Sequence, residues 1–286
     1  MSRNRDRVAG TQKPDTSPPA ALQQDDAGGF SFVVPTEFID LPSKGRFYPE
    51  NHPLRDHDTI EIKQMTAKEE DMLTSKSLLK KGVALERVIS SVIVDKRINP
   101  SHLLVGDRNA IIIASRVSAY GNMYDTKVQC PACGETQRYC FDLNETPVID
   151  SEIEEGNLLI TDNKDGTFTT ELPRTKLLVT FTLLTGMSEK RMLDGLEADR
   201  KTRNQHERGV TRQLAGMIVA VNGNNTSEAI NYTVNNIPSA DSRHLRLAYK
   251  QASPDVDMNR HFECEACGHE ERMEVPLTAD FFWPDR

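Results

Sequence analysis

Four cysteines form two motifs of the same design that could bind a metal ion. Cys130 and Cys133 lie in one C-x-x-C-G sequence, and Cys264 and Cys267 lie in another. Two such motifs supply four thiolates, and a tetrahedral site with four sulfur ligands leaves no open position for water. The spacing therefore predicts a structural Zn²⁺ site with these four cysteines as ligands, one that stabilises a fold and does not catalyse a reaction.

Two other uses of paired cysteines fit the sequence less well. A thiol oxidoreductase needs a single C-x-x-C motif near a β-α-β unit, whereas this chain has two motifs, each predicted on a β-hairpin. An iron–sulfur cluster also takes four cysteines, but paired ribbon-like turns are more typical of zinc. No apolar signal segment follows the N-terminal residues, which predicts a reducing compartment, where paired cysteines favour metal binding over disulfides.

Each motif is predicted to form the turn of a hairpin, and together the two hairpins predict a zinc-ribbon-like module. The glycines after the second cysteines, Gly134 and Gly268, provide the positive φ that such a turn needs. The two motifs are separated by 130 residues, from 134 to 263, so the metal is expected to join the middle of the chain to its end. Strands are expected over 127–129 and 139–143 around the first turn, and over 261–263 and 272–277 around the second.

Other residues near the motifs have weaker claims to chemistry. Cys140, on the returning strand of the first hairpin, is expected to be a small buried hydrophobe and not a fifth ligand. His261 and His269 flank the second motif, but four thiolates make neither of them necessary. The sequence contains no G-x-S-x-G, H-E-x-x-H, Walker or G-x-G-x-x-G motif, so the chain is predicted not to be an enzyme.

The rest of the chain predicts an α+β protein with a helical body and β-hairpins. Prolines divide the segment before residue 65 into irregular β structure, with a Pro-Ser-Lys-Gly turn at 42–45. Thr66 and Glu69 have the spacing of a capping box, which marks the start of a helix. Helices are expected over 66–79, 83–94, 105–120, 188–208, 210–221, 227–235 and 239–252, and strands over 158–160, 168–172 and 176–184.

These signals divide the chain into six segments. They are a flexible N-terminal arm over 1–29, an irregular β segment over 30–64, a helical region over 65–125, the first zinc knuckle over 126–145, an inserted β-hairpin and helical region over 146–256, and the second zinc knuckle with an aromatic C-terminus over 257–286.

Charge and hydrophobicity limit the partners. The formal net charge of −8 argues against nucleic acid, because phosphate binding needs clustered cations. No apolar run approaches the roughly 18 residues of a membrane span, so no membrane contact is expected. The one basic concentration is interleaved with acidic residues and is expected to be a solvated helix face; it consists of Arg200, Lys201, Arg203, Arg208 and Arg212.

Three aromatic residues follow the second knuckle. Phe281, Phe282 and Trp283 cannot remain in water. They either pack against the chain's own knuckle or insert into a neighbouring subunit, and the sequence favours neither.

The order of several motifs resembles the T4-type bacteriophage baseplate hub protein family. The motifs, between about Phe38 and Pro284, are Leu41-Pro42-Ser43-Lys44-Gly45, Tyr48-Pro49, Met65-Thr66-Ala67-Lys68-Glu69-Glu70, the two C-x-x-C-G knuckles and Phe281-Phe282-Trp283-Pro284. The resemblance implies a non-enzymatic structural or assembly protein of the baseplate hub of a contractile tail. It implies other baseplate or tail proteins as partners, including tail tube or tape-measure components, and a place in the virion after assembly in the host cytoplasm.

A zinc-ribbon adaptor for nucleic acid is the alternative function. The residues around the second knuckle oppose it, since a negative surface repels a phosphate backbone. These residues are Glu263, Glu265, Glu270, Glu271 and Glu274.

Overall fold

The computed structural model describes residues 22–24, 30–80, 82–151, 153, 158–201, 208–276 and 279–282. The chain divides into two compact units, Met1–Pro35 and Thr36–Arg286. In the first unit, strand β1 (Leu22–Gln24) pairs antiparallel with β2 (Phe30–Phe32). Apart from β1, the predicted arm over 1–29 lies outside the described residues.

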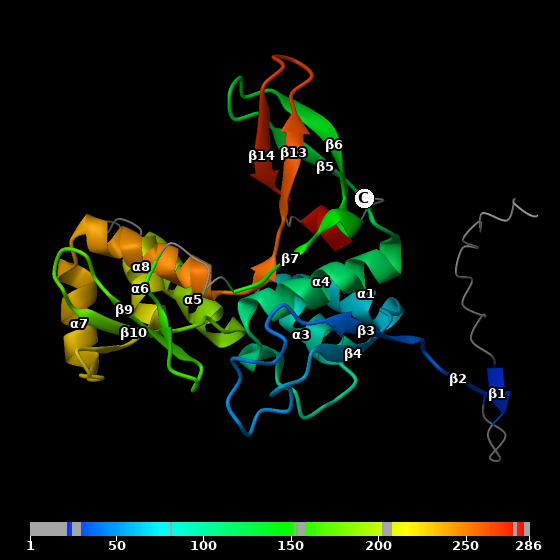
Figure 1. The fold of residues 1–286 in the computed structure, drawn as a ribbon. Helices are drawn as coiled ribbons and strands as arrows, with labels where there is room; N and C mark the ends of the chain where they lie inside the picture. Colours follow the sequence, from blue (N-terminus) through cyan, green and yellow to red (C-terminus); the bar gives the residue numbers. More distant parts are fainter. Residues whose placement is uncertain are drawn as a thin grey trace, which may run out of the picture. The chain divides into compact units, whose positions relative to one another are not determined.

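The second unit confirms the predicted α+β class, because its helices are combined with short antiparallel sheets (Figure 1). Strand β3 (Thr36–Asp40) pairs with β4 (Thr59–Lys63), and the irregular segment 41–58 connects them. Helices α1 (Ala67–Thr74), α2 (Lys76–Lys80) and α3 (Ala84–Val92) follow. The single helix expected over 66–79 is thus interrupted at Ser75, whose backbone is extended.

The predicted capping box at the start of α1 is present. The carboxylate of Glu69 accepts hydrogen bonds from the backbone amide of Thr66 at 2.9 Å and from its hydroxyl at 2.6 Å. The Glu69 side chain is fully buried and also accepts from Ser91 and from the ammonium of Lys63. Burial raises the pKa of this carboxyl, but the donors outweigh burial and lower it from 4.5 to about 2.

We expect Glu69 to make the stability of the fold sensitive to acid. Its contribution is complete above pH 4.5 and is lost as the pH falls through about 2, because the unfolded chain takes up the proton first. The full contribution is on the order of 3 kcal/mol. Urea denaturation at several values between about pH 7 and pH 3 measures how the free energy of unfolding falls with pH. The Glu69→Gln variant should show a flatter dependence of this free energy on pH. An equal slope for both proteins would contradict this role.

Helix α4 (Val105–Tyr120) lies at the centre of the helical region, as Figure 1 shows. It follows a short 3-10 turn, η1 (Pro100–His102), and it contacts α3, β3 and α5. Ile111, Ile112 and Ile113 are buried, as the sequence predicted. Among the described residues, no helix has both the length and the apolar character needed to cross a membrane.

The inserted region contains a four-stranded sheet with helices packed on it. The strand order is β11-β10-β9-β8, from β8 (Thr161–Asp162), β9 (Thr167–Glu171), β10 (Leu178–Thr182) and β11 (Ile218–Val221). Its helices are α5 (Gly186–Lys201), α6 (Gly209–Met217), α7 (Ser227–Asn236) and α8 (Ser239–Ala252). Phe168 of β9 joins this region to the 41–58 segment, because its ring lies 5.4 Å from that of Phe47 and 5.5 Å from that of Phe181.

Two sequence-based assignments in this region are wrong. The helix expected over 210–221 ends at Met217, and residues Ile218–Val221 pair with β10 as an edge strand. The strand expected over 158–160 begins instead at Thr161, and Leu159 is 93% exposed. In both places a short apolar run has two possible secondary structures, and the neighbouring strand decides between them.

The two cysteine motifs lie on separate hairpins. Strand β5 (Met123–Gln129) pairs with β6 (Thr136–Asp142), and β13 (Asn259–Glu263) pairs with β14 (Glu270–Glu274). Two further short strands, β7 (Val148–Ile149) and β12 (Asp255–Val256), pair with each other. Short 3-10 turns follow β6 and β14, namely η2 (Leu143–Glu145) and η3 (Ala279–Phe282).

Candidate metal centre

The two hairpins lie side by side, although they are far apart in the sequence (Figure 1). The side-chain amide of Gln137 on β6 donates to the carbonyl of Glu263 at 2.9 Å and accepts from the amide of Glu265 at 2.9 Å. The hydroxyl of Tyr139 donates to the carbonyl of His261, also at 2.9 Å. These bonds align the ends of the hairpins, so that their turns face each other.

The four predicted ligands meet between the turns. The sulfur atoms of Cys130, Cys133, Cys264 and Cys267 all lie within 4.8 Å of one another. Cys130 Sγ is 3.8 Å from Cys267 Sγ, and Cys133 Sγ is 3.7 Å from Cys264 Sγ. A tetrahedron with zinc–sulfur bonds of about 2.3 Å has sulfur–sulfur edges of about 3.8 Å. The spacing of the sulfurs therefore fits a four-coordinate zinc ion.

The two turns have the same backbone geometry, which explains how each pair of sulfurs converges. Gly134 and Gly268 have φ angles of 76° and 67°, the left-handed conformation expected after the second cysteine. In the first turn Cys130 donates its amide to the carbonyl of Glu135 at 2.8 Å and accepts from the amide of Gly134 at 2.9 Å. The second turn repeats both bonds with the equivalent residues.

The electrostatics of the cluster favour a bound cation. Cys130 and Cys264 are each 1% exposed, whereas the other two cysteines are exposed. The amide of Cys133 donates to the sulfur of Cys130 and lowers the pKa of that thiol to about 6. The amide of His269 also lowers the pKa of Cys267, but the nearby sulfurs, that of Cys133 first, outweigh it and raise that pKa to about 12. Without a positive charge, these neighbouring thiols cannot all ionise.

Cys140 does not belong to the cluster, and the expectation that it is buried is wrong. It is exposed, because the side chains of β6 alternate and Cys140 shares the outward face with Arg138 and Thr136. His261 is also exposed and outside the four-sulfur group, and His269 contacts Glu271 at 3.1 Å. Neither histidine competes with the cysteines.

The aromatic C-terminus packs inside this chain as far as the structure describes it. Phe281 is 1% exposed, and its ring lies 5.2 Å from that of Tyr124 in an edge-on arrangement. Phe282 is also buried, and the guanidinium of the buried Arg116 faces the Phe281 ring. Trp283 lies outside the described residues. For Phe281 and Phe282, internal packing is therefore confirmed over insertion into a neighbouring subunit.

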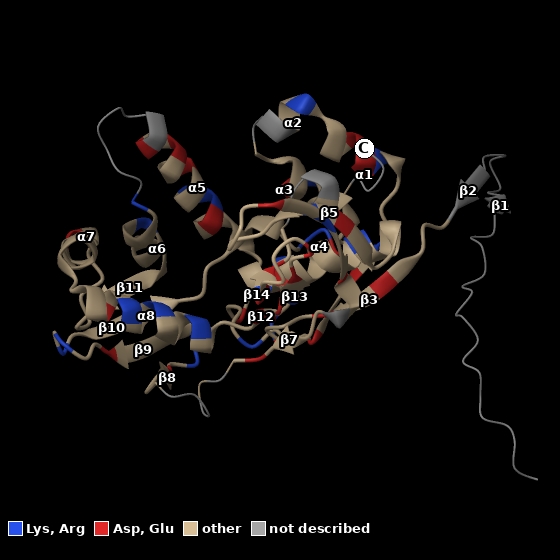
Figure 2. Cartoon of the chain, turned by 90° about the horizontal axis from the view of Figure 1, so that it is seen from above, with Lys and Arg blue, Asp and Glu red and all other residues tan. Residues whose placement is uncertain are grey.

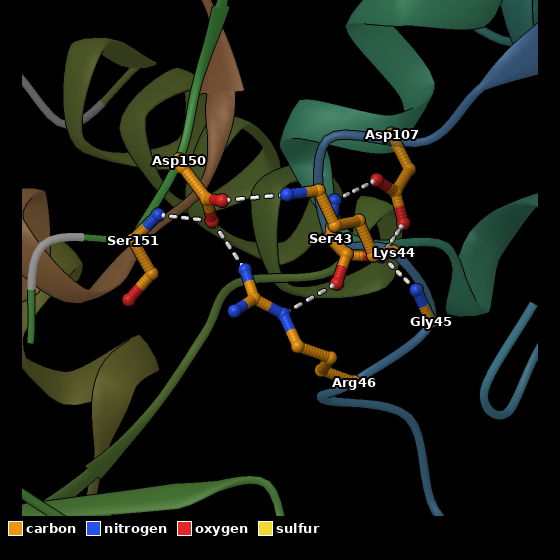
Figure 3. Close-up of polar contacts among 7 residues, drawn as sticks. All are labelled: Ser43, Lys44, Gly45, Arg46, Asp107, Asp150 and Ser151. Carbon is orange, nitrogen blue, oxygen red and sulfur yellow. Dashed lines mark hydrogen bonds and ion pairs between the residues drawn. The ribbon is translucent and has the colours of Figure 1, made fainter. Parts of the chain in front are cut away.

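A buried carboxylate in α4 fixes the Pro-Ser-Lys-Gly turn (Figure 3). Asp107 accepts hydrogen bonds from the amide and hydroxyl of Ser43, at 2.9 and 2.6 Å, and from the hydroxyl of Tyr48 at 2.7 Å. Burial raises the pKa of Asp107, and these donors oppose it. The sequence did not indicate this partner, because one aspartate in the first turn of a helix is common.

A second carboxylate holds the other side of the same turn. Asp150, just after β7, pairs with the ammonium of Lys44 at 2.7 Å and with the guanidinium of Arg46 (Figure 3). Burial raises the pKa of Asp150, but Lys44 and the other donors outweigh it and lower that pKa to about 2. The turn is thus anchored between α4 and the segment that follows the first knuckle.

The predicted basic helix face is partly internal. Arg212 of α6 binds both carboxylate oxygens of Asp199 in α5, at 2.8 and 2.7 Å, and the Asp199 side chain is buried. This pair joins two helices, so Arg212 is not simply solvated as expected. Arg203 lies outside the described residues.

Comparison with known proteins agrees with the motif order. Residues 34–283 match the model of a family described as T4 bacteriophage base plate protein. No curated protein and no solved structure matches the chain. The family match covers most of the chain and includes the turn at 42–45, the helical region and both cysteine motifs. On this evidence the chain belongs to the T4 bacteriophage base plate protein family.

Proposed function

We propose that this chain is a non-enzymatic structural or assembly component of the baseplate hub of a contractile-tailed bacteriophage. Family membership supports a structural role in the baseplate, a place in the virion tail, and contacts with other baseplate or tail proteins. The hub, contact with tail tube or tape-measure components, and assembly in the host cytoplasm are the finer parts of this proposal. They are supported by the motif order between Leu41 and Pro284.

We further propose that Cys130, Cys133, Cys264 and Cys267 bind one structural Zn²⁺. The observation that supports this most strongly is the sulfur spacing of 3.7 and 3.8 Å, together with the matching turns. A zinc ion would supply the positive charge that four neighbouring thiolates need. With four protein ligands it has no position for substrate or water, which suits a structural role.

The ion would connect two distant parts of the chain into one rigid module. Cys133 and Cys264 are 131 positions apart, and closing so long a loop costs about 4 kcal/mol in its length-dependent part. Zinc binding to four thiolates contributes on the order of 10 kcal/mol. The free energy of zinc binding is therefore larger than the entropic cost of closing the loop.

The nucleic-acid alternative receives no support from the site. The exposed side chains of β14 include Glu270, Glu271 and Glu274, and its cation Arg272 is paired with Asp257 at 2.8 Å. A phosphate backbone would meet net negative charge there.

Two measurements test the proposed function. Metal analysis of the purified chain should find one zinc per chain, because four cysteine ligands complete one tetrahedron. Mass spectrometry of purified tails and of baseplate intermediates should detect the chain together with hub proteins. A chain without zinc would contradict the metal centre, and its absence from every intermediate and particle would contradict the hub role.

A further inference from the structure

One helix face in the second unit carries unpaired positive charge. Helix α8 buries Leu245, Ala248 and Ala252 and exposes the three cations Arg243, Arg246 and Lys250. The cations follow the spacing i, i+3, i+7, so they lie along one side of the helix, and Figure 2 shows α8 with blue bands along it. Within the described part of the chain, none of the three makes a side-chain hydrogen bond or an ion pair.

The surroundings of this α8 face suit a contact with another protein. Leu247 lies among the cations and is 45% exposed, which gives the face an apolar centre. Arg174 is also exposed. It lies beside the start of α8, where its backbone amide donates to Asp241 at 2.8 Å. Arginine is enriched at protein interfaces, and a cationic face is complementary to an acidic protein surface.

The second zinc hairpin has the opposite character. Glu263 on β13 lies directly opposite Glu270 on β14, and like charges in that position destabilise a hairpin. Glu265 and Glu274 are also exposed, and among the described residues none of these four glutamates pairs with a cation. Arg272, between Glu270 and Glu274 in the strand, is already paired with Asp257.

We propose that the cationic face of α8 binds the acidic hairpin β13–β14 of a second copy of this chain. No hydrogen bond or ion pair joins these elements to each other within the described part of one chain. The dimensions agree: Arg243 to Lys250 spans about 10 Å of helix, and Glu270 to Glu274 spans about 14 Å of strand. This inference rests on the proposed function, since a structural component must make protein contacts.

The contact joins two different elements of the fold. If α8 and the hairpin of one copy both meet the same neighbour, it closes a two-fold dimer; if they meet two neighbours, it generates a ring or an open filament. Because the net charge of −8 makes copies repel in general, association depends on these opposite patches facing each other.

Charge reversal on each surface tests the proposal with the full-length chain. Sedimentation velocity at about 0.05 M salt should show concentration-dependent association that disappears near 1 M, where charges are screened within about 3 Å. The double variants Arg243→Glu with Arg246→Glu, and Glu263→Lys with Glu270→Lys, should each weaken self-association about tenfold or more. Arg138→Glu, on the exposed face of β6, is the matched control and should leave association unchanged.

An equimolar mixture of the two double variants gives the sharpest result. Mixing should restore association. The acidic α8 of one variant then faces the cationic hairpin of the other, and the unchanged cationic α8 of that other variant faces the unchanged acidic hairpin of the first. A monomeric wild-type chain at low salt, or a mixture that stays monomeric, would overturn the proposal. Salt-sensitive binding of duplex DNA that the α8 variant loses would assign this face to nucleic acid instead.

Zinc analysis of the same samples separates this inference from the proposed function. Neither double variant changes a cysteine, so both should retain one zinc per chain. Retained zinc without association rejects only the contact between copies. A wild-type chain that associates without zinc rejects the metal centre and leaves the contact supported.

Discussion

Replacing Cys264 with serine is expected to release the zinc and to expose the end of the chain to protease. Cys264 is one of the two buried cysteines of the cluster, and its sulfur lies 3.7 Å from that of Cys133 in the other hairpin. Serine removes one of the four thiolates that a tetrahedral zinc site needs, so three cysteines should hold the ion far more weakly. Zinc content should fall to near zero, and limited proteolysis should cut the segment after Phe262.

Cys140→Ser is the matched control for this experiment. It also replaces a thiol by a hydroxyl within the cysteine module. However, Cys140 is exposed on the outer face of β6 and lies outside the sulfur cluster. The control protein should keep its zinc and resist protease like the wild type. If both variants retained metal and resisted cleavage equally, the assignment of the four ligands would be wrong.

The cysteine module is the part of the fold that local sequence indicates best. A C-x-x-C-G turn positions its own two sulfurs, because the glycine and the backbone bonds around it lie within a few residues. Coordination chemistry predicts that the two turns meet, since one pair of cysteines cannot complete a tetrahedron. The bonds from Gln137 and Tyr139 that align the hairpins have no sequence signature.

Long-range contacts account for what sequence reasoning missed. Residues 218–221 follow a helix and are apolar, so only the pairing with β10 makes them a strand. Asp107 is ordinary in sequence, and its role depends on a turn 64 positions earlier. Its residue type predicts that Cys140 lies in the core, whereas the alternation of side chains along β6 turns it outward.

Asp107→Ala is expected to destabilise the second unit on the order of 4 kcal/mol. The substitution removes the acceptor of three hydrogen bonds, two from Ser43 and one from Tyr48. All three residues are buried, so water cannot readily replace the lost carboxylate, and each unsatisfied donor costs about 1 to 3 kcal/mol. Denaturant unfolding measures the loss, and zinc content should remain unchanged because the cysteines are untouched.

Asp150→Ala separates the buried anchor of this turn from the exposed one. Asp150 binds the same turn through Lys44 and Arg46, but all three side chains are about half exposed. Exposed ion pairs contribute about 1 kcal/mol or less, so this variant should remain close to the wild type. Asp107→Asn, which keeps one acceptor oxygen, should fall between the two. If Asp150→Ala were as damaging as Asp107→Ala, charge pairing at the surface, and not the buried hydrogen bonds, would hold the turn in place.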